Sequence, residues 1–256
     1  MILDHPIVSR NIFFPRSTTV EPSFFVEVED ASIACYLQQP FPDAGTVIYF
    51  GGNGELASEY ATGYADLFLD MGVNICFVEY RGYGMSTGVP TLINMLGDGE
   101  KIVKALGVAP EKLVVFGRSL GSLYAIELVD RIPQIVGLVL ESAIANLGDS
   151  LSLTTVINQL NYSEAEIMGE INAYFSLQQK LQNYFGHLLV LHTEKDGILD
   201  RSHADQLNSW AGGCNKKLVI FPKGNHNTIL FANFTSYLRQ VAEVVVQCDV
   251  ISSPTD

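Results

Sequence analysis

The sequence feature that most constrains the fold is an apolar run that ends in a glycine-flanked serine. Leu113–Phe116 is apolar and rich in β-branched residues, and Gly117, Ser119 and Gly121 follow it. The next residues, Ser122–Val129, have the apolar spacing of a helix. This pattern predicts a buried strand, a sharp turn and a helix, with glycine where a Cβ would crowd neighbouring backbone.

A Gly-x-Ser-x-Gly pattern in this setting is a candidate nucleophile elbow. The turn would hold Ser119 in a strained conformation and place its hydroxyl at a helix N-terminus, where backbone N–H groups favour negative charge. The five-residue pattern also fits a glycine-rich strand–helix turn with no catalytic role. The flanking strand and helix, and the partner residues described below, favour the elbow.

Size and composition limit the function classes. The 256 residues are 48% apolar and 17% charged, which favours one compact domain, 1–256, with a sizeable core. The formal net charge of −13 argues against nucleic acid and anionic membrane surfaces as partners. It leaves small-molecule and acyl substrates open.

The cysteines and the N-terminus indicate a reducing compartment. The four cysteines are far apart and show neither a metal-ligand spacing nor a disulfide framework. Residues 1–6 lack the basic and apolar blocks of a signal peptide, and no apolar run is long enough to span a bilayer. We therefore expect a soluble, cytoplasmic protein with no transmembrane segment. The oligomeric state is not encoded in any visible pattern.

Strand-like runs alternate with helical segments along the chain. After a hairpin, apolar runs typical of strands buried on both faces recur up to residue 221. The expected strands are Phe24–Val28, Ile33–Gln38, Thr46–Phe50, Val73–Glu79, Lys112–Phe116, Ile135–Glu141, His187–His192 and Lys217–Phe221. This order predicts an α/β fold with a mostly parallel eight-stranded sheet and helices on both faces.

Helices are expected between these strands. The apolar spacing predicts helices over Leu56–Met71, Leu92–Leu106 and Ser202–Trp210, and a last one that ends near Val246. The segment 146–182 has only helical patterning, with a candidate capping box at Ser163 and Glu166.

Two further residues follow strands at the edge where parallel sheets bind ligands. Asp196 comes in the turn after His187–His192, and His226 comes in the turn after the last strand. A serine hydroxyl needs a base to take its proton and a carboxylate to orient that base. We expect Ser119, His226 and Asp196 to fill these roles. His5, His187, His192 and His203 fall before the sheet, within a strand or on a helix.

Other carboxylates compete with Asp196 for the orienting role. Asp200 is most simply a cap for the helix that begins near Ser202, and Glu194 a solvated turn residue. Glu141, at the end of the strand after the elbow, is a third alternative.

Negative charge on a carbonyl oxygen requires preorganised donors. We assign one to the backbone N–H of Leu120, directly after the serine, and the other to the N–H of Asn53 in the glycine-rich loop after Thr46–Phe50. An ordinary glycine-rich turn or a phosphate cradle would also fit this loop. Its glycines lack the dinucleotide-binding spacing.

The chain at this point resembles the α/β-hydrolase superfamily, and within it the small serine hydrolases of the esterase, acyl-protein thioesterase and prolyl-oligopeptidase-related branches. The order Ser119, Asp196, His226 is the order of that fold. The resemblance extends from Phe24 to the last helix and rests on five motifs: Phe50–Gly54, Tyr80–Gly88, Gly117–Gly121, His192–Asp196 and Gly224–His226.

The sequence departs from the pattern at two points. Gly51 stands where the family has a histidine before Gly-Asn, and Thr193 follows His192 where a glycine is usual. The segment 146–182 lies where the superfamily has its lid. Its apolar side chains could line an acyl pocket or only pack short helices onto the body; they include Leu151, Leu153, Val156, Ile157 and Leu160.

The resemblance implies a serine hydrolase that needs neither a metal nor an organic cofactor and acts on an ester, thioester or amide through an acyl-enzyme. Acyl transfer to an acceptor other than water would use the same residues. A binding protein that kept the fold without catalysis is the alternative of a different class. A dehalogenase would have aspartate where this chain has Ser119.

Overall fold

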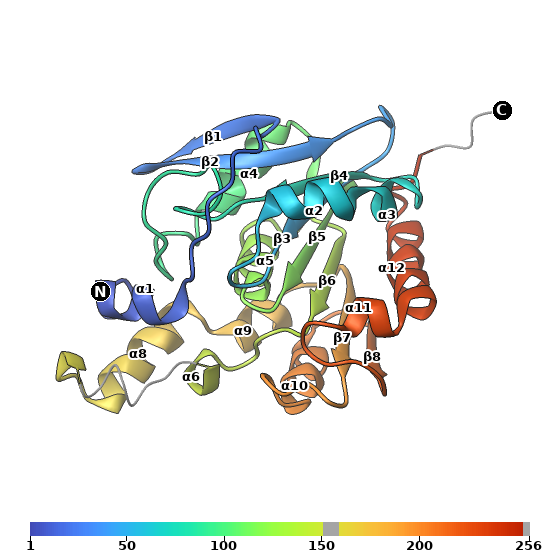
Figure 1. Ribbon diagram of the computed structural model, residues 1–256. Coiled ribbons are helices and arrows are strands. Elements are labelled where there is room, and N and C mark those ends of the chain that lie inside the picture. The colour runs from blue at the N-terminus through green and yellow to red at the C-terminus, as the bar shows by residue number, and fades with distance from the viewer. Residues whose placement is uncertain (151–158, 253–256) are drawn as a thin grey trace.

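The computed structural model describes residues 1–150 and 159–252. Its centre is a single eight-stranded sheet (Figure 1). The strands are β1 (Phe24–Val28), β2 (Ala31–Gln38), β3 (Thr46–Phe50), β4 (Asn74–Val78), β5 (Leu113–Arg118), β6 (Gly137–Glu141), β7 (His187–Thr193) and β8 (Lys216–Phe221). All eight expected strands are present.

The strands lie in the order β1-β2-β4-β3-β5-β6-β7-β8. β1 pairs with β2, and β2 with β4, in antiparallel register, and every later pair is parallel. The mostly parallel α/β sheet predicted from the sequence is therefore confirmed. Because the parallel strands share one direction, the loops that follow β3, β5, β7 and β8 meet at the same edge.

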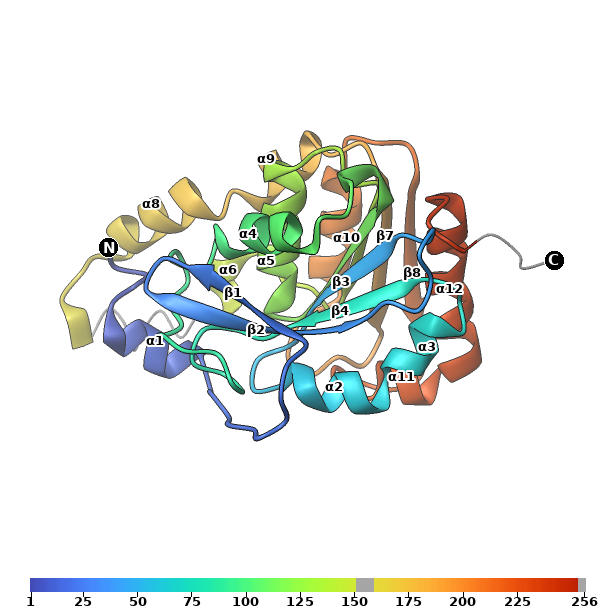
Figure 2. The ribbon, with the colours of Figure 1, turned by 90° about the horizontal axis from the view of Figure 1, so that it is seen from above.

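Helices cover both faces of the sheet (Figure 2). Alternate side chains of a strand point to opposite faces, so Ile48 and Phe50 join one core while Val47 and Tyr49 join the other. The first face is covered by α4 (Asp98–Leu106), α5 (Gly121–Arg131), α9 (Leu177–Gln182) and α10 (Ser202–Trp210). The second is covered by α2 (Ala57–Gly63), α3 (Ala65–Leu69), α11 (Ile229–Ala232) and α12 (Phe234–Gln247).

Two helix predictions are wrong in detail. The helix expected over Leu56–Met71 is divided into α2 and α3, because Tyr64, directly after Gly63, adopts φ −120° and ψ −13°. Of the helix expected over Leu92–Leu106, only Asp98–Leu106 is helical. Side chains take the amides before it: Asp4 accepts from the N–H of Ile93 at 2.8 Å, and Asn94 accepts from that of Thr91 at 3.2 Å. These bonds favour turns over a helix.

The N-terminal segment forms a helix that the sequence analysis did not predict, α1 (Pro6–Ile12). His5 caps it, since Nδ1 accepts a hydrogen bond from the N–H of Ile7 at 3.2 Å, and proline occupies the first turn. α1 lies beside α8 (Glu164–Tyr174) (Figure 1). The N–H of Leu3 donates to the carboxylate of Glu170 on α8 at 2.8 Å. The chain start is thereby held against the segment that follows β6.

The segment 146–182 contains the short helices α6 (Leu147–Ser150), α8 and α9. The capping box is confirmed: Ser163 Oγ accepts from the N–H of Glu166 at 3.3 Å, and Glu166 accepts from the N–H of Ser163 at 2.8 Å. Leu160 packs against the core. Leu151, Leu153, Val156 and Ile157 lie outside the described residues. In the described part of the chain, no helix is both long and apolar enough to cross a bilayer.

The packing of β5 against α5 gives the first prediction. A Cβ on Gly117 would lie 2.6 Å from Cβ of Ala125 and 2.7 Å from Cα of Ser122. Gly117→Ala should therefore lower the free energy of unfolding by about 1–3 kcal/mol through overpacking. Gly169→Ala is the matched control, because Gly169 lies within α8 and nothing is within 4 Å of its added Cβ.

The free energy of unfolding of Gly169→Ala should equal that of wild type or exceed it by about 0.5–1 kcal/mol, because alanine has the higher helix propensity. Urea denaturation of both variants measures the difference. If Gly117→Ala is as stable as Gly169→Ala, β5 and α5 are packed less closely at Gly117 than described.

Candidate active site

Ser119 occupies the turn between β5 and α5. Its φ of 49° is in the left-handed region, a strained conformation for a residue with a Cβ. Gly121 begins α5 where an added Cβ would lie 2.2 Å from the carbonyl oxygen of Phe50. The strand end, the start of the helix and the loop after β3 therefore meet at van der Waals distance around the serine.

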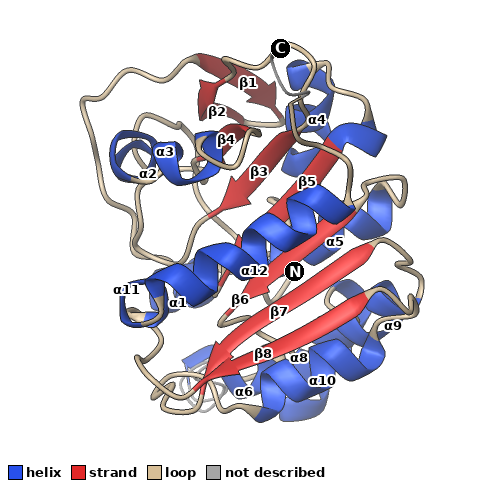
Figure 3. Cartoon of the chain, turned by 90° about the vertical axis from the view of Figure 1, so that its right-hand side faces the viewer, coloured by secondary structure: helices blue, strands red, loops and turns tan. Residues whose placement is uncertain are grey.

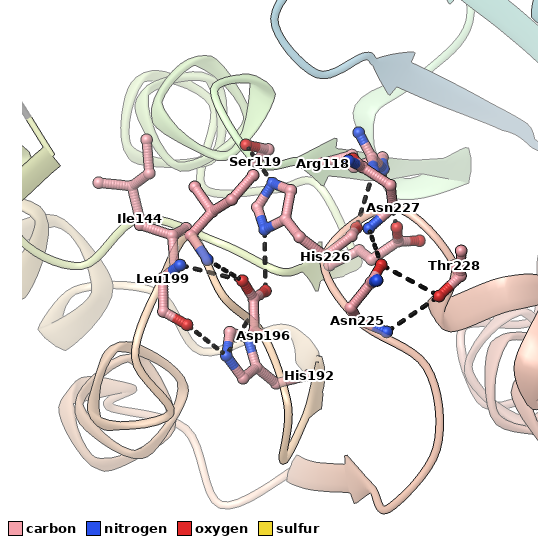
Figure 4. Close-up of polar contacts among 12 residues, drawn as sticks. Arg118, Ser119, Ile144, His192, Asp196, Leu199, Asn225, His226, Asn227 and Thr228 are labelled. Carbon is pink, nitrogen blue, oxygen red and sulfur yellow. Dashed lines mark hydrogen bonds and ion pairs between the residues drawn. The ribbon is translucent and has the colours of Figure 1, made fainter.

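The structure brings Ser119, His226 and Asp196 together (Figure 4). Ser119 Oγ lies 2.9 Å from Nε2 of His226, and Nδ1 of His226 lies 2.8 Å from Oδ2 of Asp196. His226 is in the loop after β8 and Asp196 in the loop after β7, as their positions in the chain predict. The histidine is 5% exposed, and the serine faces a pocket.

Backbone hydrogen bonds fix the Asp196 carboxylate. Its Oδ1 accepts from the N–H groups of Ile198 and Leu199, both at 2.9 Å. Burial acts to raise its pKa, but the hydrogen bonds from His226, Leu199 and Ile198 outweigh burial and lower the pKa to about 2. Asp196 is therefore an ionised acceptor. Nδ1 of His226 must carry the hydrogen of that contact, which leaves Nε2 free to accept from Ser119.

The other candidate acids lie elsewhere. Asp200 accepts from the N–H of Ser202 at 2.9 Å in the turn before α10, but Arg201 is the N-cap residue of α10 and no side chain caps the helix, so the expected cap is not formed. Glu194 forms an ion pair with Arg201 at 2.8 Å, with both side chains about half exposed. Glu141 is buried and binds Arg118 and the hydroxyl of Tyr237. Within the described residues, the ring of His226 contacts Asp196 and Ser119 and none of these three acids.

Two of the other histidines support the loops around the site. His192 is fully buried beneath Asp196, with Nε2 3.2 Å from the carbonyl oxygen of Leu199 and 3.8 Å from Asp196 Oδ2. Burial lowers its pKa, which favours the neutral ring. Nδ1 of His203 accepts from the N–H of Ala145 at 3.0 Å. His5 caps α1 and His187 begins β7, so neither reaches Ser119.

A buried arginine next to the serine joins several loops, and the sequence analysis did not single it out. Arg118 Nε donates to Glu141 at 2.9 Å, Nη1 pairs with Glu55, and Nη2 donates to the carbonyl oxygen of His226 at 2.8 Å. Glu55 also accepts from the N–H of Gly52 at 2.5 Å. The sequence did contain a signal for it. Arg118 is a charged residue inside the elbow motif, and acidic residues stand at or after the ends of the two strands that pair with β5. We name Arg118, Glu55 and Glu141 the arginine cluster.

The two expected oxyanion donors line the same pocket as Ser119. Within residues 1–150 and 159–252, the backbone N–H groups of Leu120 and Asn53 have no hydrogen-bond acceptor. The Asn53 side chain is engaged: its Oδ1 accepts from Tyr83 Oη at 2.8 Å and from the N–H of Phe14 at 3.2 Å, and its amide group donates to the carbonyl of Ile12. The Asn53 side chain thus joins the loop after β3 to the N-terminal segment. In this loop Gly51 stands in place of the histidine that is usual in the family.

The pocket around Ser119 has a volume of about 500 Å³. Its apolar walls come from α1 and the residue pair after it, from the segment after β6 up to the start of α6, and from the loop after β7: Val8, Ile12, Phe14, Ile144, Leu147, Ile198 and Leu199. The contribution of α1 was missed because the helix itself was not predicted. Among the described residues, no group of three His, Cys, Asp or Glu side chains is arranged to hold a metal ion.

Comparison with known proteins places this arrangement in a family. The profile described as "Serine aminopeptidase, S33" matches residues 42–185, which include the serine turn and end before the two other residues of the site. "Alpha/beta hydrolase domain-containing protein 17C" of Mus musculus is 24% identical over 226 residues, which are 86% of this chain and 67% of that protein. "Protein bem46" of Schizosaccharomyces pombe is 25% identical over 221 residues, 84% of this chain and 72% of that one. The chain thus spans about two thirds of its curated relatives.

Solved structures show the same fold. An esterase of Pyrococcus furiosus, Pf2001, superimposes with a TM-score of 0.72 at 16% identity, over 92% of this chain and 98% of that one. The sheet order, the turn that holds the serine and the family profile over more than half of the chain agree. This chain belongs to the α/β-hydrolase superfamily, in the family described as serine aminopeptidase, S33.

Proposed function

We propose that this protein is a serine hydrolase that cleaves a carboxylic ester or thioester through an acyl-enzyme on Ser119. The observation that supports it best is the unbroken chain of contacts, Ser119 Oγ to His226 Nε2 at 2.9 Å and His226 Nδ1 to Asp196 at 2.8 Å, at the wall of a pocket. Such a chain can activate a hydroxyl that is otherwise a weak nucleophile.

In the acylation step, Ser119 Oγ attacks the carbonyl carbon while Nε2 of His226 takes the hydroxyl proton. The carbonyl oxygen becomes an oxyanion, and the free N–H groups of Leu120 and Asn53 are the donors we assign to it. Asp196 stabilises the imidazolium. The tetrahedral adduct then collapses, the bond to the leaving group breaks, and His226 gives its proton to the departing alcohol or thiol.

Deacylation repeats these steps with water. His226 Nε2 takes a proton from the water, the hydroxide oxygen bonds to the acyl carbon, and the bond to Ser119 Oγ breaks as the serine recovers its proton. The carboxylic acid is released. An alcohol or amine in place of water would give acyl transfer instead, so analysis of the products distinguishes the two reactions.

The charges of the pocket favour a neutral substrate. Glu55 and Arg118 are the charged side chains, other than those of the proposed triad, among the described residues that line it, and they are paired with each other. An aminopeptidase requires a group that holds the substrate's ammonium, and no carboxylate is free for that among the described residues that line the pocket. The apolar walls from Ile144, Leu147 and Leu199 fit an acyl or alkyl group. The name of the Pyrococcus furiosus neighbour, an esterase, agrees with this choice.

Substitution of the serine and the histidine tests the proposal. Ser119→Ala and His226→Ala should lower the turnover of p-nitrophenyl butyrate by roughly 10⁴-fold or more, because each removes a member of one catalytic unit. A fluorophosphonate probe should label wild type and leave Ser119→Ala unlabelled. Asp200→Asn is the control, because Asp200 accepts from the N–H of Ser202 in the turn before α10 and is not part of the proposed triad. Folded wild type without turnover or labelling would contradict the proposal.

The pKa of Asp196 gives a pH prediction. Its folded value, about 2, is below the ordinary value of 3.8. Ionised Asp196 therefore stabilises the fold above about pH 4, and this contribution is lost as the pH falls toward 2. The difference in unfolding free energy between wild type and Asp196→Asn should shrink between pH 4.5 and pH 2.5 in urea titrations. A difference that stays constant over this range would show that the carboxylate is not stabilised by its partners.

The arginine cluster gives a kinetic prediction. Arg118→Lys keeps the charge but loses the fork that reaches Glu141, Glu55 and the His226 carbonyl together. We expect kcat to fall by roughly 10²-fold through misplacement of the loops, with KM nearly unchanged. Arg131→Lys is the matched control, since Arg131 pairs with Glu127 and Glu100 at the far end of α5. An Arg118→Lys enzyme with wild-type kcat would rule out a positioning role.

A further inference from the structure

A second cavity lies on the face of the sheet opposite α5. It has a volume of about 260 Å³ and is bounded by α2 and α3 on one side and by α11 and α12 on the other. Figure 3 shows α2, α3 and α12 on this face, with α12 crossing the sheet. We name it the aromatic pocket, because aromatic side chains make up much of its wall: Tyr49, Tyr60, Tyr64, Phe68, Phe116, Phe231 and Tyr237.

The aromatic rings of the pocket are already arranged for stacking. Tyr49 stacks on Phe116 with ring centroids 4.7 Å apart and an interplanar angle of 24°, and its centroid is 5.2 Å from that of Tyr60. At the outer end, Tyr64 lies edge-on to Phe231, which is 66% exposed. A flat aromatic molecule that enters between these helices can therefore make offset or edge contacts on several sides.

One polar atom in this wall is unused. Tyr49 is 6% exposed, and within the described residues its hydroxyl makes no hydrogen bond. Burial raises the pKa of Tyr49 well above its usual range, so the hydroxyl stays neutral and can both donate and accept. A ligand in the pocket that carries a hydroxyl group would supply a hydrogen-bond partner for it.

The floor of the pocket sets the charge of its ligand. Glu55, Arg118 and Glu141 form the floor, and they are two carboxylates paired with one guanidinium. The guanidinium is occupied by these carboxylates and by the loop after β8. An anionic ligand would therefore face a net negative charge in a buried site, and no lining residue in the described part of the chain offers it a free cation. The floor favours a neutral ligand over an anion.

The aromatic pocket and the pocket around Ser119 have a wall in common. Glu55, Arg118 and Asn227 line both cavities. Ser119 and His226 line only the second. An occupant of the aromatic pocket would thus contact the ion pairs that connect the serine turn to the loops after β3 and β8, without entering the proposed active site.

We propose that the aromatic pocket is a binding site for a neutral, flat aromatic molecule that carries one hydroxyl group. The ring packs among Tyr49, Tyr60 and Phe116, and the hydroxyl hydrogen bonds with that of Tyr49. This site is separate from the one where the hydrolysis of an ester is proposed, and its occupation requires no catalytic step.

Calorimetric titration with 2-naphthol, without any substrate, tests the site independently of the proposed hydrolysis. We expect saturable one-to-one binding to wild type. The anion 2-naphthoate, which has the same ring system, should bind at least about tenfold more weakly because of the negative floor. Equal affinity for the two probes, or no saturable binding of 2-naphthol, would overturn the proposal.

Three variants locate the binding. Leu67→Trp places a large side chain in the wall of the pocket and should abolish binding, whereas Leu69→Trp, a half-buried position on the same helix outside the wall, should bind as wild type does. Tyr49→Phe keeps the ring and should weaken 2-naphthol by about fivefold, the value of one hydrogen bond. Thermal unfolding checks that each variant is folded. If Leu67→Trp does not fold, the affinity of Tyr49→Phe for 2-naphthol tests the location of the site by itself. Undiminished binding in either would place 2-naphthol elsewhere and contradict the proposal.

Discussion

The steric constraint at the turn between β5 and α5 determines how the rest of the site is built. Ser119 is held at a φ of 49°, and Gly121 lets the start of α5 approach the end of β3 more closely than any side chain would allow. A turn this tight is stable only if the surrounding structure holds it. Parallel pairing of β5 with β3 and β6 supplies that support and directs the loops from four strands to one edge of the sheet.

Electrostatics then connect these loops. Arg118, the residue before the serine, reaches the loop after β8 through the carbonyl of His226 and the loop after β3 through Glu55 and the N–H of Gly52. Charges at buried positions, such as Arg118 and Glu141, are costly unless every partner is present. Some of the partners here are backbone groups of the loops, the N–H of Gly52 and the carbonyl of His226, so the cost of burial is fully offset only when those loops are in place. The same cluster separates the two cavities.

Much of this arrangement could be predicted from the sequence, and the part that could not has physical reasons. The strands are continuous apolar runs with distinct ends, and Asp196 and His226 directly follow two of them, so the order of the strands in the sheet brings them to Ser119. The apolar spacing of Leu92–Leu106 predicted too long a helix. Spacing alone does not show that side chains accept hydrogen bonds from the amides of Thr91 and Ile93.

α1 and the arginine cluster were missed because their roles depend on contacts between distant parts of the chain. α1 is held at the pocket partly by Asn53, which binds the backbone on either side of Phe13, 39 to 41 residues away in sequence. The central claim, that Ser119 is acylated during turnover, is tested most directly by rapid acid quench of wild type with p-nitrophenyl acetate, followed by peptide mass spectrometry. The account predicts one acetyl group, on the peptide that contains Ser119, which His226→Ala does not accumulate at the wild-type rate. Turnover with no acetylated peptide, or with the acetyl group on another residue, would contradict it.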